Sequence, residues 1–231
     1  TNSHPYITRK QGTPEGLRVV PVGDGLTIQR ESMAGALVVP VLRQDGTISS
    51  LQLIAPPDTA QRLKAAGKTD KLNLPGATME GWFTVGEMVT GGTVYLCEGI
   101  GTAWACWKAT GRAAVVCFGW GRVRDVAAEM RQSDKSARLV LVPAVGKEEA
   151  AERIARDVGA AVAAMPDGWP NNSDVNDLGQ AEGFEVVDIL LSNASDSQEV
   201  GPKLHPLARF VDFDGTAKPP RWVIPGFIGH G

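Results

Sequence analysis

From residue 93 onward, apolar runs typical of β-strands alternate with segments that have helical spacing. The apolar runs cover residues 93–97, 113–120, 138–144 and 160–166. Helices are predicted between them, at about 102–109, 123–132 and 147–158. Short connections of this kind favour right-handed crossovers and a mainly parallel sheet with helices on both faces. The alternation therefore predicts an α/β domain over residues 91–191.

The segment before residue 91 has a different pattern. Two β-type runs, 36–42 and 47–54, flank an Asp45-Gly46 turn and predict a hairpin. Residues 64–87 are rich in Gly, Lys and Thr, and predict loops with a short strand near 81–85. We therefore expect a smaller α+β subdomain over residues 1–90.

The carboxy-terminal stretch, residues 192–231, is expected to be a separate region. Residues 192–202 are polar and predict a linker, whereas the last residues, 220–231, are apolar again. An apolar run with no following partner is typical of a chain that is cut at a domain boundary.

Composition excludes several classes of protein. The formal net charge of −3 argues against binding of nucleic acid through bulk charge, although a local basic groove remains compatible with it. Cys97, Cys106 and Cys117 lack the CxxC spacing of zinc sites and lie in or beside apolar runs, so we expect reduced thiols in the core. No stretch is long and apolar enough to span a bilayer, and the first residues lack the apolar region of a signal peptide. These features predict a cytoplasmic protein without a membrane partner.

Glu98 is the acidic residue that the pattern singles out. It directly follows the apolar run 93–97 and precedes Gly99, where a helical pattern begins. In an open parallel sheet, ligands bind at the carboxyl ends of the strands. Glu98 is therefore a candidate site residue, although a solvated acid at a strand end has the same local sequence.

The residues from about 93 to 191 resemble a TOPRIM domain, which occurs in bacterial-type primases, topoisomerases and some nucleases. Glu98-Gly99 is similar to its first motif, and the run CFGWGRVRDVA is similar to the loop and helix after the second strand of primases. Residues 173–178, Ser-Asp-Val-Asn-Asp-Leu, resemble the Asp-x-Asn-Asp-Leu stretch of plasmid and phage members.

The resemblance to primases extends over nearly the whole chain. A Pro-containing strand, an Asp-Gly hairpin and the Lys-x-Asn stretch at Lys71 and Asn73 are similar to the amino-terminal half of primases. The opening HPYITRKQ resembles a His-Pro-Tyr-x-x-Arg-Lys start in conjugative and phage primases. The tail PRWVIPGFIGHG looks like the approach to a RecA-type ATPase core. The chain is therefore similar to the primase part of a plasmid- or phage-type primase-helicase of bacterial origin.

This resemblance implies template-directed primer synthesis on single-stranded DNA, with Mg²⁺ or Mn²⁺ as cofactor and nucleoside triphosphates as substrates. A RecA-type helicase domain would follow in the natural chain. Glu98 would be a metal ligand or the general base, and Asp174 and Asp177 would be further ligands, because hard cations prefer carboxylate oxygens. The residues expected to contact nucleotide or template are Lys71, Asn73, Lys64, Arg43 and Lys10.

The sequence departs from the family at the third strand. Where an Asp-x-Asp pair is expected after residues 138–143, the chain has Ala144-Val145-Gly146, so Ala144 and Gly146 occupy vacated ligand positions. Either the site has decayed, or Ala144 replaces an aspartate. In both cases we expect the chain as it stands to be weak or inactive.

Two other functions are compatible with the same residues. A TOPRIM nuclease uses similar ligands to cleave DNA, but it has no need for the Lys-x-Asn half. A decayed, non-catalytic module would only bind single-stranded DNA or tether a helicase. Asp174 and Asp177 also have a purely structural interpretation, because aspartate is favoured where a turn enters a helix.

Overall fold

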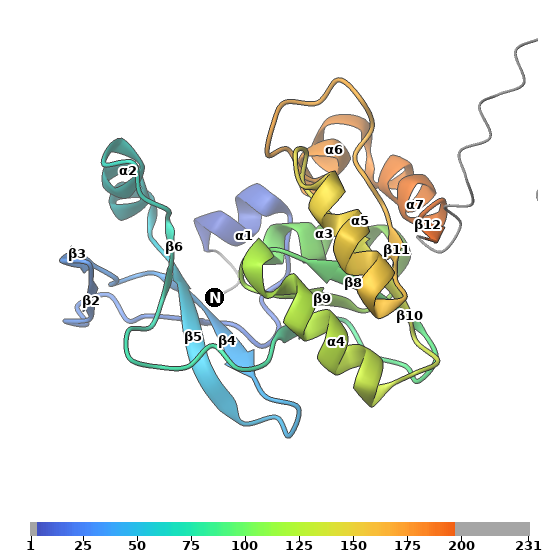
Figure 1. Cartoon of the computed structure of the whole chain (residues 1–231). Coiled ribbons are helices and arrows are strands. Elements are labelled where there is room, and N and C mark those ends of the chain that lie inside the picture. Colours follow the sequence, from blue (N-terminus) through green and yellow to red (C-terminus); the bar gives the residue numbers. More distant parts are fainter. Residues whose placement is uncertain (1–3, 197–231) are drawn as a thin grey trace, which may run out of the picture. The chain divides into compact units, whose positions relative to one another are not determined.

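The structure is a computed structural model of the chain, and it describes residues 4–196. Two sheets carry the fold of this part (Figure 1). The first has the strand order β1-β4-β5-β6, and the second has the order β12-β11-β10-β8-β9-β7. The mainly parallel second sheet with flanking helices, preceded by a smaller α+β part, confirms the predicted fold class.

The first sheet is antiparallel throughout. Its strands are β1 (Arg18–Val19), β4 (Leu37–Leu42), β5 (Ile48–Ile54) and β6 (Lys71–Asn73). The predicted hairpin is present, with β4 and β5 joined through the Asp45-Gly46 turn. The remaining elements of this part are α1 (Pro5–Lys10), α2 (Pro57–Ala65), and the short pair β2 (Thr27–Ile28) and β3 (Glu31–Ser32).

The second sheet has a parallel centre and antiparallel edges. Its strands are β7 (Phe83–Val85), β8 (Thr93–Cys97), β9 (Ala114–Val116), β10 (Arg138–Val142), β11 (Ala161–Val162) and β12 (Ser195–Asp196). Strands β9, β8, β10 and β11 run parallel, whereas β7 and β12 are antiparallel to their neighbours. The core strands are short and buried on both faces, which explains why their sequences are continuous apolar runs rather than alternating ones.

Helices cover both faces of this sheet, as the sequence predicted (Figure 1). One face packs against α3 (Ile100–Thr110), α6 (Val175–Glu182) and α7 (Phe184–Ser192). The other packs against α4 (Val123–Ser133) and α5 (Glu148–Val158), and a 3₁₀ turn, Trp120–Arg122, leads into α4. The three predicted helices correspond to α3, α4 and α5.

The strand near residues 81–85 forms, but it belongs to the second sheet. β7 pairs with β9, although the sequence placed it in the amino-terminal subdomain, residues 1–90. The predicted linker also begins later than residue 192, because Ser195 and Asp196 pair with β11. Residues 197–231, with the rest of the linker and the proposed ATPase entry, lie outside the described residues.

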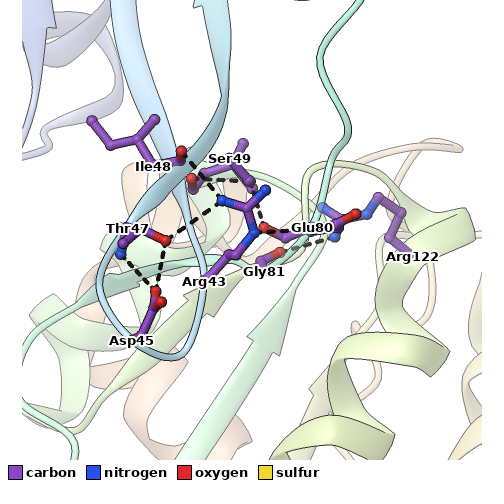
Figure 2. A network of polar contacts seen from close by, with 9 residues as sticks. Arg43, Asp45, Thr47, Ile48, Ser49, Glu80, Gly81 and Arg122 are labelled. Atoms are coloured by element: carbon purple, nitrogen blue, oxygen red, sulfur yellow. Dashed lines mark hydrogen bonds and ion pairs between the residues drawn. The ribbon is translucent and has the colours of Figure 1, made fainter.

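Backbone pairing joins the two sheets at one point. Leu42, the last residue of β4, forms an antiparallel bridge with Trp82, and both backbone N–H···O bonds measure 2.9 Å. The residues next to the bridge form polar contacts, which Figure 2 shows: Arg43 Nε donates to Glu80 at 3.0 Å, and Arg122 Nη2 donates to the Gly81 carbonyl at 2.9 Å. We call this region the sheet junction (residues 42–49, 80–82 and 122).

The cysteines lie in the core as reduced thiols, as predicted. Cys97, Cys106 and Cys117 are all buried and unpaired by disulfides. Burial raises the pKa of Cys117 to about 12, so this thiol stays protonated at neutral pH.

Among residues 4–196, no helix has the length and apolar character that crossing a membrane requires.

Gly81 provides a test of the sheet junction. Its φ of +99° is unfavourable for other residues, and a Cβ there would lie 1.9 Å from the Leu42 carbonyl oxygen. Gly81→Ala must therefore break the bridge to Trp82, and we expect a loss of about 3 kcal/mol in the free energy of unfolding, measured by urea denaturation. Gly67→Ala is the matched control, because Gly67 has a φ of +70° with open space around it. The control should lose only about 1–2 kcal/mol, and equal losses in the two variants would contradict the assigned role of Gly81.

Candidate functional site

Glu98 lies at the carboxyl edge of the second sheet, directly after β8. Its backbone carbonyl accepts a hydrogen bond from Gly119 N at 3.0 Å, which brings the loop after β9 against it. Gly99 is the N-cap of α3, so the helix begins immediately after the acid. The Glu98 side chain is partly buried, and no residue of the described part hydrogen-bonds its carboxylate. This carboxylate is therefore available to a ligand.

The turn after β10 lies at the same edge, because β8 and β10 are parallel and Cys97 pairs in register with Val142. Val145 N donates to the Ser173 carbonyl at 2.9 Å, and Asn172 N donates to the Val145 carbonyl at 3.0 Å. The turn containing Ala144 is thus bound to the segment that leads into α6. The partly buried Ala144 stands where the sequence resemblance expects an acid.

Gly146 is a poor position for an acidic ligand in this conformation. Its φ is +90°, and a Cβ would lie 2.5 Å from Asn171 Oδ1. An aspartate at 146 would need Asn171 to move and would also carry the strain of a left-handed backbone. The two positions at which the resemblance expects acids are therefore not equivalent, since Ala144 has no such conflict.

Asp174 and Asp177 form a capping box at the start of α6. Asp174 Oδ1 accepts from the backbone N–H groups of Asn176 and Asp177, and Asp177 Oδ2 accepts from Asp174 N at 3.1 Å. The remaining oxygens also have partners: Thr102 Oγ1 donates to Asp174 Oδ2 at 2.9 Å, and Lys10 Nζ lies 3.0 Å from Asp177 Oδ1. Both aspartates therefore have a structural role.

Asn176, between the two aspartates, connects α6 to the end of α1. It is fully buried, and its Nδ2 donates to the Lys10 carbonyl at 2.9 Å. Its Oδ1 accepts from Gln180 on the next turn of α6. The Asp-x-Asn-Asp stretch thus holds α1 and α6 together, which explains the combination of an amide with two acids.

Lys71 reaches the same edge from the first sheet. Its Nζ lies 3.0 Å from the position that a Cβ of residue 99 would occupy. Burial lowers the pKa of Lys71, but the pKa still lies above its ordinary value because nearby acidic groups favour the charged form. These groups are Tyr6, Asp70, Asp174 and Glu98. Glycine at 99 therefore leaves room for an ammonium group beside Glu98.

The other predicted contact residues are distributed unevenly. Asn73 lies on β6 with Lys71, and its Oδ1 accepts from Gln52 at 3.1 Å. Lys64 lies on α2 and pairs with Asp70 at 3.0 Å. Arg43 lies at the sheet junction, where it pairs with Glu80. The structure thus brings Lys71 and Lys10 to the carboxyl edge of the second sheet, and it does not bring Arg43 there.

Sequence reasoning missed Thr102 as a partner of Asp174. The two residues are 72 positions apart, so no local pattern connects them. The one available signal was the position of Thr102 four residues after Glu98, in the first turn of the predicted helix. The structure shows that Thr102 is buried there. No local sequence pattern indicated that Gly99 makes room for Lys71, because the two residues meet only in the tertiary structure.

The acidic residues present do not fit a divalent cation. Within residues 4–196, no three His, Cys, Asp or Glu side chains lie together in a way that could hold a metal ion. Asp174 and Asp177 already use their oxygens, and Ala144 and Gly146 offer none. Glu98 is left as a single free carboxylate, whereas Mg²⁺ sites require several oxygen ligands.

Comparison with known proteins shows similarity at the level of the fold. No protein-family model matches the sequence, and no curated protein is similar to it by sequence. Solved structures do match. A crystal structure of the zinc-binding and RNA polymerase domains of the Aquifex aeolicus primase is 12% identical to this chain, with a TM-score of 0.56. The match covers 83% of this chain and 55% of that one.

Two further structures agree with this result. A DnaG primase catalytic domain bound to ssDNA is 13% identical with a TM-score of 0.58, and the match covers 85% of this chain and 73% of that one. The RNA polymerase domain of the Mycobacterium tuberculosis primase DnaG is 18% identical with a TM-score of 0.57, and the match covers 83% of this chain and 75% of that one. The chain spans 55% of the length of the Aquifex structure. Its described part has the fold of a bacterial primase catalytic core.

Asp174 allows its structural role to be separated from a role of its charge. Asparagine caps a helix as well as aspartate does, whereas alanine loses the cap and costs about 1–2 kcal/mol. We therefore expect Asp174→Ala to lower the free energy of unfolding by that amount and Asp174→Asn to leave it within a few tenths of a kcal/mol, measured by urea denaturation. A large loss in Asp174→Asn would indicate that the carboxylate charge itself, and not the cap, stabilises the fold.

Proposed function

We propose that this chain is the primase part of a plasmid- or phage-type primase-helicase and that it binds nucleotide and single-stranded template at the Glu98 edge. One observation carries the proposal: on a primase-like fold, the Lys71 ammonium from the first sheet lies against Gly99, beside Glu98. This proximity supports the proposal that Lys71 of the Lys-x-Asn stretch and the Glu-Gly dipeptide, far apart in sequence, belong to one site. The chemistry proposed for this family of sites is nucleotidyl transfer to a 3′-hydroxyl.

Lys71 is the best-supported phosphate contact of the proposed set. Among the described residues, Lys10, Lys64 and Arg43 are each engaged by a carboxylate within 3.0 Å. Lys71 has no ion pair of that kind, yet its surroundings keep it charged. An ammonium that is charged and not closely paired can bind a phosphate oxygen of a triphosphate or of the template backbone.

The proposed activity is impaired in this chain, because the ligand set is incomplete. Nucleotidyl transfer needs Mg²⁺ or Mn²⁺ to neutralise the charge that develops on a triphosphate, and the acidic residues present in the described part do not fit such a cation. Glu98 is the one free carboxylate at the described edge, and Ala144 is the position where a second fits best. Glu98 would accept the proton of the attacking hydroxyl or act as a ligand. The function that this incomplete ligand set leaves to the chain is the binding of nucleotide or single-stranded template.

The missing ligands favour a second candidate, a non-catalytic module that binds single-stranded DNA or tethers a helicase. This candidate shares Lys71 with the first and differs in needing no acid at position 144. A nuclease of similar fold would need the acid but not the Lys71 half. Binding and catalysis therefore have to be measured separately.

The binding part is tested with Lys71→Ala. Loss of one charge-assisted contact worth about 1.5 kcal/mol should weaken binding of a fluorescein-labelled single-stranded oligonucleotide about tenfold at low salt. The difference should shrink at high salt, because phosphate contacts act through counterion release. Lys68→Ala is the control, since Lys68 is an exposed lysine near the end of α2. Equal affinities of the Lys71 and Lys68 variants, measured by anisotropy, would remove Lys71 from the site.

The catalytic part is tested with Ala144→Asp. The new carboxylate would lie at the edge that holds Glu98, so Mn²⁺ affinity should rise, and a positioned metal worth several kcal/mol should raise primer synthesis about a hundredfold or more. The assay is nucleotide polymerisation on single-stranded templates, with plasmid nicking measured in parallel, for the chain as it stands, for Ala144→Asp, and for Ala144→Asp with Glu98→Gln. Primer products that vanish with Glu98→Gln support the primase, and nicking with the same dependence supports the nuclease. No product and no gain in Mn²⁺ affinity would leave the binding module.

A further inference from the structure

A pocket that Glu98 does not line lies on the face of the second sheet that packs against α4. It is a pocket of ≈ 330 Å³ whose lining includes Leu42, Trp82, Met88, Val89, Met130 and Leu139. Val94 also lines it, near the amino end of β8, whereas Glu98 follows the carboxyl end of the same strand. The pocket therefore extends from Trp82, which lies level with the carboxyl end of β9, to the amino ends of β8 and β10, and we call it the amino-edge pocket after the latter end. Its size is at the lower end of the range for small-molecule sites.

The amino-edge pocket adjoins the sheet junction. Leu42 and Trp82, which form the bridge between the sheets, both line it. Gln44 Nε2 donates to Ser133 Oγ at 3.0 Å, so the hairpin of the first sheet contacts the end of α4 across the pocket wall. Figure 2 shows the polar network around this hairpin. The walls come from both sheets and are held in place by backbone and side-chain bonds, so the pocket is preformed.

The floor and one rim of the amino-edge pocket are apolar. Val94, Met130 and Leu139 are buried beneath it. At the rim, the adjacent apolar residues Met88 and Val89 are 45% and 64% exposed, so apolar surface is accessible there. Trp82 is partly buried and contributes an aromatic surface. Thioethers and an indole make favourable contacts with flat rings.

The charges around the amino-edge pocket disfavour phosphate. Arg43, the lining cation, is paired with Glu80, so its charge is largely compensated. Asp134 lines the pocket as well, and hydrogen bonds from Ser136 and from the Gly91 backbone lower its pKa to about 2, so it is ionised at neutral pH. A phosphate group would be repelled by the Asp134 carboxylate, which accepts hydrogen bonds but has no ion pair among the described residues. A nucleotide is therefore a poor ligand, in contrast to the Glu98 edge.

We propose that the amino-edge pocket binds a small, neutral, planar aromatic molecule of one or two fused rings. The flat ring would cover Val94 and Leu139 and contact Trp82 and the two methionines, and it would bury the exposed Met88 and Val89 side chains. The pocket volume is too small for a helix, and the adjacent negative charge disfavours anionic ligands. Because the ligand would contact residues of the bridge between the two sheets, its binding should also raise the temperature of unfolding.

Indole is the probe, and methionine methyl groups report its position. The chain has five methionines. Met88 and Met130 line the amino-edge pocket, whereas Met33 and Met165 are buried in other parts of the core. In ¹³C-methyl-methionine NMR spectra, indole should shift the Met88 and Met130 signals in a saturable manner and leave Met33 and Met165 in place. Indole-3-acetate should bind at least tenfold more weakly, because Asp134 repels its carboxylate.

A pair of variants separates this pocket from non-specific binding. Ser133→Trp places an indole ring at the pocket wall, whereas Gln132→Trp places the same ring on the neighbouring exposed position of α4, outside the lining. We expect Ser133→Trp to weaken indole binding at least tenfold and Gln132→Trp to leave it unchanged, with both variants folded by circular dichroism. If Met88 and Met130 do not shift, if all the methionines shift alike, or if both variants bind equally, the proposal is wrong. If Ser133→Trp fails to fold, the methionine pattern and the indole-3-acetate comparison still decide the matter.

Discussion

The parallel pairing of β8 with β9 on one side and β10 on the other is the constraint on which the site depends. Cys97 lies in register with Val116 and with Val142, so the three strands end at the same level. The residues that follow them, Glu98, the loop at Gly119 and the turn at Ala144, are consequently brought to one edge. The strands are buried on both faces, and this burial stabilises the register, because a shift would expose apolar side chains.

The second requirement is that the first sheet stays in place relative to the second, because Lys71 belongs to the first and Glu98 to the second. Two groups of contacts meet this requirement within the described part. One is the Leu42–Trp82 bridge. The other is α1, whose Lys10 carbonyl accepts from Asn176, and whose Tyr6 ring lies 6.1 Å from that of Trp104. Contacts on both sides of the site thus determine where the ammonium of Lys71 lies.

Much of the fold was predictable from the sequence because it depends on local patterns. The alternation after residue 93 and the Asp45-Gly46 turn correspond to the observed strands, helices and hairpin. Pairings between distant segments were not predictable in this way. β7 joins the second sheet through an edge pairing with β9, and Arg43 lies at the sheet junction because of how the hairpin packs. The meeting of Lys71 with Gly99 also depends on tertiary structure alone, although the residues on each side were identified.

The absence of an acid at position 144 has opposite effects on metal binding and on phosphate binding. A carboxylate about 4 Å from a phosphate oxygen repels it by about 4 kcal/mol at an effective dielectric constant of 20, unless a cation lies between them. Alanine at 144 offers no metal ligand at this edge and causes no such repulsion. Lys71 remains charged beside Glu98 and compensates part of its negative charge. Under the proposed function, alanine at 144 would therefore leave an edge without a metal site at which a phosphate group meets less repulsion, so that binding of a nucleotide or template would not require the catalytic ligand set.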